Sequence, residues 1–171
     1  MTRASFKFLL AFVPAAGFAV MFRGVSACAQ QEQGSERPLS FGVGLGVAAK
    51  PGGSIGSLGL GTLELGTPWR NTDVRLDAAF MNWPGRFSGG RVTSLTSNLV
   101  YSHPVGIFAP YLLGGIGGYA EQGVGTAFGV NAGVGIKASV RRLRPFVELR
   151  EHVWSADRTR RATPLTLGLA F

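Results

Sequence analysis

The chain ends in the stretch Thr163-Pro164-Leu165-Thr166-Leu167-Gly168-Leu169-Ala170-Phe171. From Leu165 onward every second residue is large and apolar, and the residues between them are small. This period-2 alternation is typical of a β-strand with one apolar face and one slim face. An aromatic residue at the end of the apolar face predicts a strand that closes a sheet rather than a polar, poorly ordered tail.

Similar alternation recurs from residue 39 onward, without a convincing amphipathic helix. Segments rich in Gly, Pro or charged residues separate the alternating runs, as in antiparallel sheets with tight turns. In the second run the apolar phase slips between Leu60 and Leu63, which predicts a bulge near Gly61. The segment from Ser155 to Ala162 is expected to be a charged loop. The expected strands cover about 39–50, 56–66, 72–83, 91–102, 109–120, 127–139, 145–155 and 163–171.

The composition favours one strand-rich domain. The chain has 171 residues, of which 46% are hydrophobic and only 15% charged, against roughly 25% charged in an average soluble domain. The 26 glycines alternate with apolar residues, so they indicate strands rather than a disordered linker. The single cysteine excludes an intrachain disulfide. The net charge of +8 comes without a nucleic-acid-binding motif, and attraction to anionic lipid headgroups accounts for it more simply.

Residues 1–29 have the features of a secretory signal peptide. Arg3 and Lys7 make the start positive, an apolar run covers residues 8–22, and Ala27-Cys28-Ala29 is a small-residue cleavage pattern. The run is shorter than the about 20 residues of a spanning helix, although an uncleaved amino-terminal anchor remains an alternative.

A second interpretation concerns Cys28. The residues Val25-Ser26-Ala27-Cys28 resemble a bacterial lipobox, which makes Cys28 a candidate lipidation site. Both interpretations export the chain. Residues 30–38 are polar and non-periodic and are expected to form a short flexible lead-in. The remaining residues, 39–171, then form the β-sheet domain.

Alternation alone does not tell which face of the sheet meets water. A soluble barrel directs its apolar face inward, whereas a membrane barrel directs it toward lipid. Here the other face is rich in small residues, which suit a narrow lumen. Its charges have both signs, as a confined interior requires, because a lone buried ion is costly. We expect a lumen charge network drawn from Glu64, Asp73, Arg75, Asp77, Lys137, Glu148 and Arg150.

Large aromatic residues occur near the ends of the expected strands. Membrane barrels carry such residues as girdles at the two membrane interfaces. The sequence therefore predicts interfacial girdles made of Trp69, Trp83, Tyr101, Tyr111, Tyr119 and Trp154.

With these features the chain resembles the small eight-stranded outer-membrane β-barrels of the OmpA/OmpX type. The resemblance implies an all-β fold, an eight-stranded antiparallel up-and-down transmembrane β-barrel, located in the bacterial outer membrane. It also implies a monomer whose partners are outer-membrane lipid, lipopolysaccharide and the barrel-assembly machinery. That machinery would read Leu165, Leu167, Leu169 and Phe171 as the assembly signal. The resemblance covers 39–171 and rests on residues 110–119, 144–150 and 165–171.

The sequence shows no pattern of catalytic chemistry. Of the two histidines, His103 precedes a proline in an expected turn, and His152 shares a strand face with Glu148 and Arg150. We interpret His103 as a solvated turn residue and His152 as a structural hydrogen-bonding group in the lumen. No serine lies at a spacing typical of barrel deacylases, and two distant histidines do not make a metal site. The Gly-rich stretch 42–46 is followed by no helix and is therefore no phosphate loop.

We therefore expect a non-enzymatic outer-membrane protein without a cofactor or metal, with a structural, adhesive or envelope-interaction role. Two alternatives remain at this stage. The first is a narrow pore for small solutes, although eight strands usually leave an interior that side chains fill. The second is an exported soluble barrel that binds an apolar ligand.

Overall fold

A computed structural model describes residues 39–84, 90–155 and 158–171 of the protein. The expected signal peptide, the lead-in and Cys28 lie outside these residues. The described chain forms eight strands and no helix, so it has no helix that could cross a membrane. The strands are β1 (Leu39–Ala49), β2 (Ile55–Gly66), β3 (Thr72–Trp83), β4 (Gly90–Ser102), β5 (Phe108–Glu121), β6 (Gly125–Ala138), β7 (Arg144–Ser155) and β8 (Thr159–Ala170).

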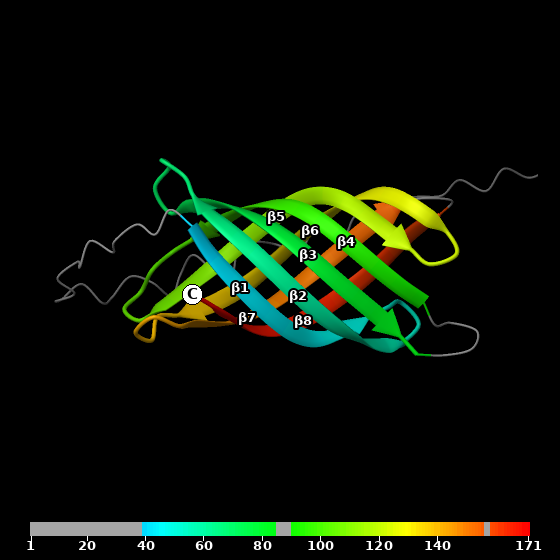
Figure 1. Cartoon of the computed structure of the whole chain (residues 1–171), viewed down its shortest axis with the longest axis horizontal. Coiled ribbons are helices and arrows are strands. Elements are labelled where there is room, and N and C mark those ends of the chain that lie inside the picture. Colours follow the sequence, from blue (N-terminus) through cyan, green and yellow to red (C-terminus); the bar gives the residue numbers. More distant parts are fainter. Residues whose placement is uncertain (1–38, 85–89, 156–157) are drawn as a thin grey trace, which may run out of the picture. The chain divides into compact units, whose positions relative to one another are not determined.

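Each strand pairs antiparallel with the next, and β8 pairs with β1 to close the barrel. The expected eight-stranded antiparallel up-and-down barrel is thus confirmed. Figure 1 shows the strands inclined to the long axis of the barrel, as closure of a small sheet requires. At the closing seam, Phe41 and Phe171 exchange two backbone hydrogen bonds of 3.1 and 2.9 Å. The final residue therefore takes part in closure.

The two ends of the barrel differ in the segments they carry. One end holds the start of β1, the carboxy terminus and the turns 67–71, 103–107 and 139–143. We call it the terminal end. The other end holds the remaining connections, of which 50–54 and 122–124 are described in full, and we call it the loop end.

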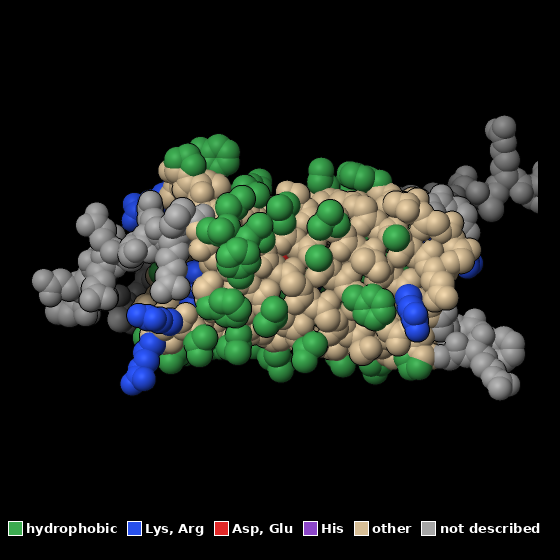
Figure 2. All heavy atoms as spheres, in the orientation of Figure 1, with side chains coloured by type: hydrophobic (Ala, Val, Ile, Leu, Met, Phe, Trp, Pro, Cys, Tyr) green, Lys and Arg blue, Asp and Glu red, His purple; other side chains and the backbone are tan. Residues whose placement is uncertain are grey.

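The apolar face of the sheet points outward. Leu45 on β1 and Leu167 on β8 are 75% and 63% exposed, whereas the alternate residues face the interior and are mostly buried. The outward charged residues of the described strands, Arg91, Glu151 and Arg161, all lie toward the loop end. Figure 2 shows hydrophobic side chains spread over the barrel wall, with Lys and Arg side chains near its ends. Such a surface buries its apolar area in lipid.

The interior glycines provide space for large lumen side chains. A Cβ atom at Gly135 would overlap the ring of Tyr111, and one at Gly168 would overlap the ring of Phe146. Both rings point into the lumen from neighbouring strands. The small residues on the inward face therefore leave the space that its few large side chains occupy.

Two expectations about strand geometry are wrong. The predicted bulge near Gly61 is absent, because β2 pairs with β1 and β3 in an uninterrupted register. Leu58 and Leu60 instead point inward and are buried, so the phase slip reflects apolar residues on both faces of one regular strand. The segment expected to be a loop up to Ala162 is also partly strand, because β8 begins at Thr159 and pairs with the end of β7.

One proline interrupts the ladder between β7 and β8. Pro164 lies in the middle of β8 and has no backbone N–H to donate. The pairing of β7 with β8 is continuous up to Leu149–Leu165 and resumes at His152–Ala162. Beside this gap, the Thr163 hydroxyl donates a hydrogen bond of 2.7 Å to the Glu151 carboxylate. A side-chain contact thus replaces part of the missing backbone pairing.

Candidate functional site

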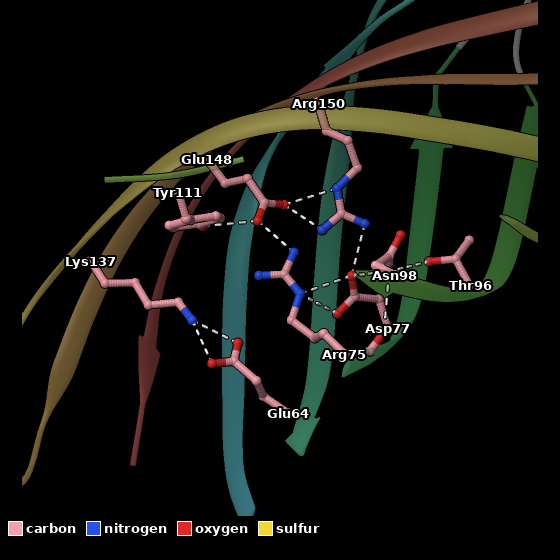
Figure 3. Close-up of polar contacts among 9 residues, drawn as sticks. All are labelled: Glu64, Arg75, Asp77, Thr96, Asn98, Tyr111, Lys137, Glu148 and Arg150. Carbon is pink, nitrogen blue, oxygen red and sulfur yellow. Dashed lines mark hydrogen bonds and ion pairs between the residues drawn. The ribbon is translucent and has the colours of Figure 1, made fainter. Parts of the chain in front are cut away.

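The interior half near the terminal end contains a compact group of four ionised side chains (Figure 3). Arg75 and Asp77 come from β3, and Glu148 and Arg150 from β7. On each strand the two residues are two positions apart, so both point into the lumen. The Arg150 Nη1 atom lies 2.8 Å from Asp77 Oδ2, and Arg75 Nε lies 3.1 Å from Asp77 Oδ1. Glu148 accepts hydrogen bonds from both arginines.

These four side chains are almost fully buried, and their formal charges sum to zero. Neutral groups complete the coordination of the carboxylates. Tyr111 donates a hydrogen bond of 2.9 Å to Glu148, and Asn98 donates one of 2.9 Å to Asp77. Buried charges persist only when they are paired and hydrogen-bonded in this way. Together with Thr96, which accepts from Asn98 at 3.1 Å, these seven residues form what we call the charged layer.

A second ion pair lies closer to the terminal mouth of the lumen. Lys137 Nζ is 2.6 Å from both carboxylate oxygens of Glu64. The same ammonium group lies 5.1 Å from the ring centroid of Tyr111, while the Arg75 guanidinium lies 5.8 Å from it. Tyr111 thus connects this pair with the rest of the charged layer.

The structure places six of the seven residues expected to form the lumen charge network in ion pairs. Asp73, half-buried at the start of β3, forms no ion pair within 4.0 Å among the described residues and instead contacts Glu64 through a side-chain hydrogen bond. Sequence reasoning also missed Asn98, Thr96 and Tyr111 as partners, although all three share the inward phase of their strands.

The interior half near the loop end is aromatic rather than charged. The Tyr119 and Trp154 rings stack with centroids 5.2 Å apart, and the Tyr119 hydroxyl lies 2.8 Å from His152 Nδ1. The Trp83 indole N–H donates to the Ala48 carbonyl at 2.8 Å. All four of these large side chains are buried. We call Trp83, Tyr119, His152 and Trp154 the aromatic layer.

The predicted aromatic girdles are therefore mostly wrong. Trp83, Tyr111, Tyr119 and Trp154 point into the lumen, and only Trp69 and Tyr101 are exposed. The position of each buried aromatic residue in the inward–outward alternation of its strand indicates that it faces the lumen. Trp154 lies two and four positions after His152 and Arg150 on β7, so an inward Arg150 requires an inward Trp154.

Charged residues cover the aromatic layer at the loop end. Glu121 accepts a hydrogen bond of 3.2 Å from the Trp154 indole and forms an ion pair of 2.9 Å with Arg160. Lys50, in the connection after β1, lies 3.9 Å from the centroid of the Trp83 ring. Burial lowers the pKa of Lys50 below its usual value; the Glu121 carboxylate opposes this shift and the Arg160 guanidinium adds to it.

A water-sized cavity lies between the two layers. Its volume is about 10 Å³, and its lining includes Ser94, Arg150, His152 and Pro164. A cavity of this size takes about one water molecule. This cavity is therefore too small for a substrate.

The two lumen side chains with nucleophile and base chemistry on this cavity, Ser94 and His152, do not contact each other. His152 bonds to Tyr119, whereas Ser94 Oγ, on the same cavity, makes no hydrogen bond. A nucleophile needs a base within hydrogen-bond reach, and Ser94 has none. Within the described ranges no cluster of His, Cys, Asp and Glu could hold a metal ion. His103 lies exposed at the start of the turn after β4.

Several solved structures share this fold. The outer-membrane enzyme PagL superimposes with a TM-score of 0.65 at 17% sequence identity, covering 76% of this chain and 98% of PagL. Neisserial surface protein A superimposes with a TM-score of 0.63 at 12% identity, covering 77% of this chain and 94% of that protein. The fold is that of the small outer-membrane β-barrels.

A third neighbour is the amino-terminal barrel domain of Pseudomonas aeruginosa OprF, with a TM-score of 0.50 at 14% identity and coverage of 77% and 97%. No family model and no curated protein matches the sequence. At these identities the likeness extends to the fold, and one fold of this kind hosts an enzyme as well as other outer-membrane proteins. The role of this barrel therefore depends on its own residues.

Proposed function

We propose that the protein is a non-enzymatic, monomeric integral barrel of the bacterial outer membrane, with a structural or envelope-interaction role. The observation that carries the proposal is the continuous outward apolar surface on a sheet without free edges. Only closed barrels and helices satisfy their backbone hydrogen bonds within lipid. The terminal end faces the periplasm, and the signal peptide 1–29 is removed on export.

The filled interior supports a non-catalytic role. The charged and aromatic layers occupy the described lumen, and the cavity of about 10 Å³ between them is too small for a substrate. This arrangement gives no support to the narrow pore. An exported soluble barrel would need a polar exterior, whereas the outward face of this sheet is apolar.

The short connections favour a structural role over adhesion. The described loop-end connections are 50–54 and 122–124, which offer little surface for a protein partner. The partners that fit the outer surface are outer-membrane lipid and lipopolysaccharide. The partner that fits the terminal strand is the barrel-assembly machinery, which would read Leu165, Leu167, Leu169 and Phe171.

Deleting Phe171 in the native host tests the proposal. Burying its side chain contributes only about 1.5–3 kcal/mol, but the residue closes the seam with Phe41 and ends the assembly signal. We expect the deletion variant to be lost from the outer-membrane fraction and degraded or aggregated in the periplasm. The measurement is membrane fractionation with heat-modifiable gel migration as the readout of folding.

Phe128→Ala is the matched control, because Phe128 is an equally large outward aromatic residue on β6, away from the seam. This variant should reach the outer membrane at normal yield. Normal yield and heat-modifiability of the Phe171 deletion would contradict the assembly signal. Recovery of the wild-type protein in a soluble fraction would contradict the proposed location itself.

A further inference from the structure

The hairpin between β6 and β7 presents two arginines at the terminal end. Val140 and Leu143 exchange two backbone hydrogen bonds of 2.9 and 3.0 Å, so Arg141 and Arg142 form a two-residue loop. Both arginines are exposed, and among the described residues neither forms an ion pair. The flanking Val140 and Leu143 are exposed apolar residues. The hairpin thus combines positive charge with apolar surface.

The neighbouring hairpin, between β4 and β5, has a glycine at the position that Arg141 occupies here. Val105 and Phe108 close that hairpin in the same way, with hydrogen bonds of 2.7 and 3.1 Å. Its first loop residue is Gly106 at φ 60°, whereas the equivalent Arg141 adopts φ 57°. A residue with a Cβ is strained in this left-handed region, whereas glycine is not. An arginine at a position that suits glycine suggests a use for its side chain.

A shallow groove lies on the outer wall next to the same hairpin. Its volume is about 310 Å³, close to the lower limit of small-ligand sites, about 300 Å³. Ala138 and Pro145 are the last and second residues of the two strands that the hairpin joins, and their side chains are short. Larger outward residues surround them. The outward lining residues are Phe108, Ile136, Ala138, Pro145, Val147 and Leu167.

We propose that this hairpin and groove bind a membrane glycerophospholipid with an anionic headgroup. One acyl chain lies in the apolar groove, and the phosphate contacts the Arg141 and Arg142 guanidinium groups. Arginine suits this role because its planar fork pairs with phosphate through two parallel hydrogen bonds. The groove supplies buried apolar area and the arginines supply charge complementarity, so one lipid engages both features.

This inference rests on the proposed membrane location, since the terminal end then lies at the periplasmic leaflet. The test uses the full chain purified from membranes in mild detergent. Native mass spectrometry measures retention of dioleoyl phosphatidylglycerol against dioleoyl phosphatidylcholine, which has the same acyl chains and no net charge. We expect the wild-type barrel to retain the anionic lipid preferentially. Equal retention of the two lipids would overturn the proposal.

Arg141→Gly is the decisive variant, because it removes the charge while relieving the backbone. The barrel should remain folded and heat-modifiable, and its preference for phosphatidylglycerol should fall about fivefold. Arg91→Ala is the matched control: it removes one exposed positive charge at the loop end, and the lipid preference should stay unchanged. If both substitutions lowered the preference for phosphatidylglycerol equally, the preference would follow from the net charge of the protein. That result would overturn the proposed site.

A second pair of variants tests the groove. Ala138→Phe fills it and should reduce retention of both lipids, whereas Ala132→Phe, on the outward face of the same strand but away from the groove, should not. Unchanged retention in Ala138→Phe would overturn the acyl-chain position. Failure of the wild-type protein to fractionate with membranes would instead refute the proposed location. Loss of lipid selectivity in an inserted, heat-modifiable barrel would refute only this inference.

Discussion

The two halves of the lumen are filled by different chemistry on the same strands. On β7, Glu148 and Arg150 belong to the charged layer, and His152 and Trp154 belong to the aromatic layer. The charged layer depends on complete pairing, because each carboxylate and each guanidinium is deprived of water. The aromatic layer depends on packing, with few polar atoms to satisfy. One inward strand face can therefore be filled by either kind of side chain, provided that buried charges cancel.

The difference predicts unequal sensitivity to single substitutions. Glu148 accepts hydrogen bonds from Arg75, Arg150 and Tyr111, so its loss leaves two buried cations with one carboxylate, Asp77. We expect Glu148→Ala to lower the free energy of unfolding by about 3–5 kcal/mol. Urea unfolding in detergent measures this. A loss below about 1 kcal/mol would mean that the layer behaves as a solvated surface.

The aromatic layer should respond less to loss of a polar atom. Tyr119→Phe keeps the stack on Trp154 and removes only the hydroxyl that contacts His152. The expected cost is about 1–3 kcal/mol, the penalty of one unsatisfied buried group. Tyr101→Phe, at an exposed tyrosine, is the control and should change stability by less than about 0.5 kcal/mol. If Tyr119→Phe cost as much as Glu148→Ala, the contrast between the layers would fail.

The smallest effect is expected when a whole ion pair is removed. The double variant Glu64→Gln with Lys137→Met replaces the pair near the terminal mouth by neutral groups of similar size. Its stability should stay within about 1 kcal/mol of the wild type, because the attraction lost is offset by the desolvation cost avoided. The single variant Lys137→Met should be less stable than the double variant. The opposite order, also read from urea unfolding, would show that the pair is a net source of stability.

The sequence predicted the charged half of the lumen better than the aromatic half. Alternation at period 2 determined most of the strands and their faces. Arg75, Asp77, Glu148 and Arg150 were identifiable because an ionised side chain in mid-strand, out of phase with the lipid-facing residues, has to lie in the lumen. Trp83 and Trp154 were assigned to girdles because aromatic residues near strand ends suit an interface as well as a lumen. Their phase favours the lumen, and phase is the stronger signal here.

Other errors had a common physical cause. Leu58 and Leu60 are apolar residues in a lumen that is apolar at that level, so hydrophobicity did not distinguish the two faces of β2. Arg160 resembles a loop residue in the sequence, yet its pairing with Glu121 allows β8 to continue past it to Thr159. In both cases the orientation of the residue depends on side chains of other strands. The hydrophobic pattern of a single strand does not contain that information.

The gap at Pro164 has a consequence for how the barrel frays. The β7–β8 seam consists of two separate ladders, one from His152–Ala162 to Ser155–Thr159 and one from Arg144–Ala170 to Leu149–Leu165. Opening that begins at the loop end can remove the first ladder without unzipping the second, because they share no backbone hydrogen bond across Pro164. The β1–β8 seam has an unbroken register from Gly42–Ala170 to Ala49–Thr163 and opens as one cooperative unit. The last strand is therefore joined to the first strand by one continuous ladder and to its neighbour in sequence by two separate ones.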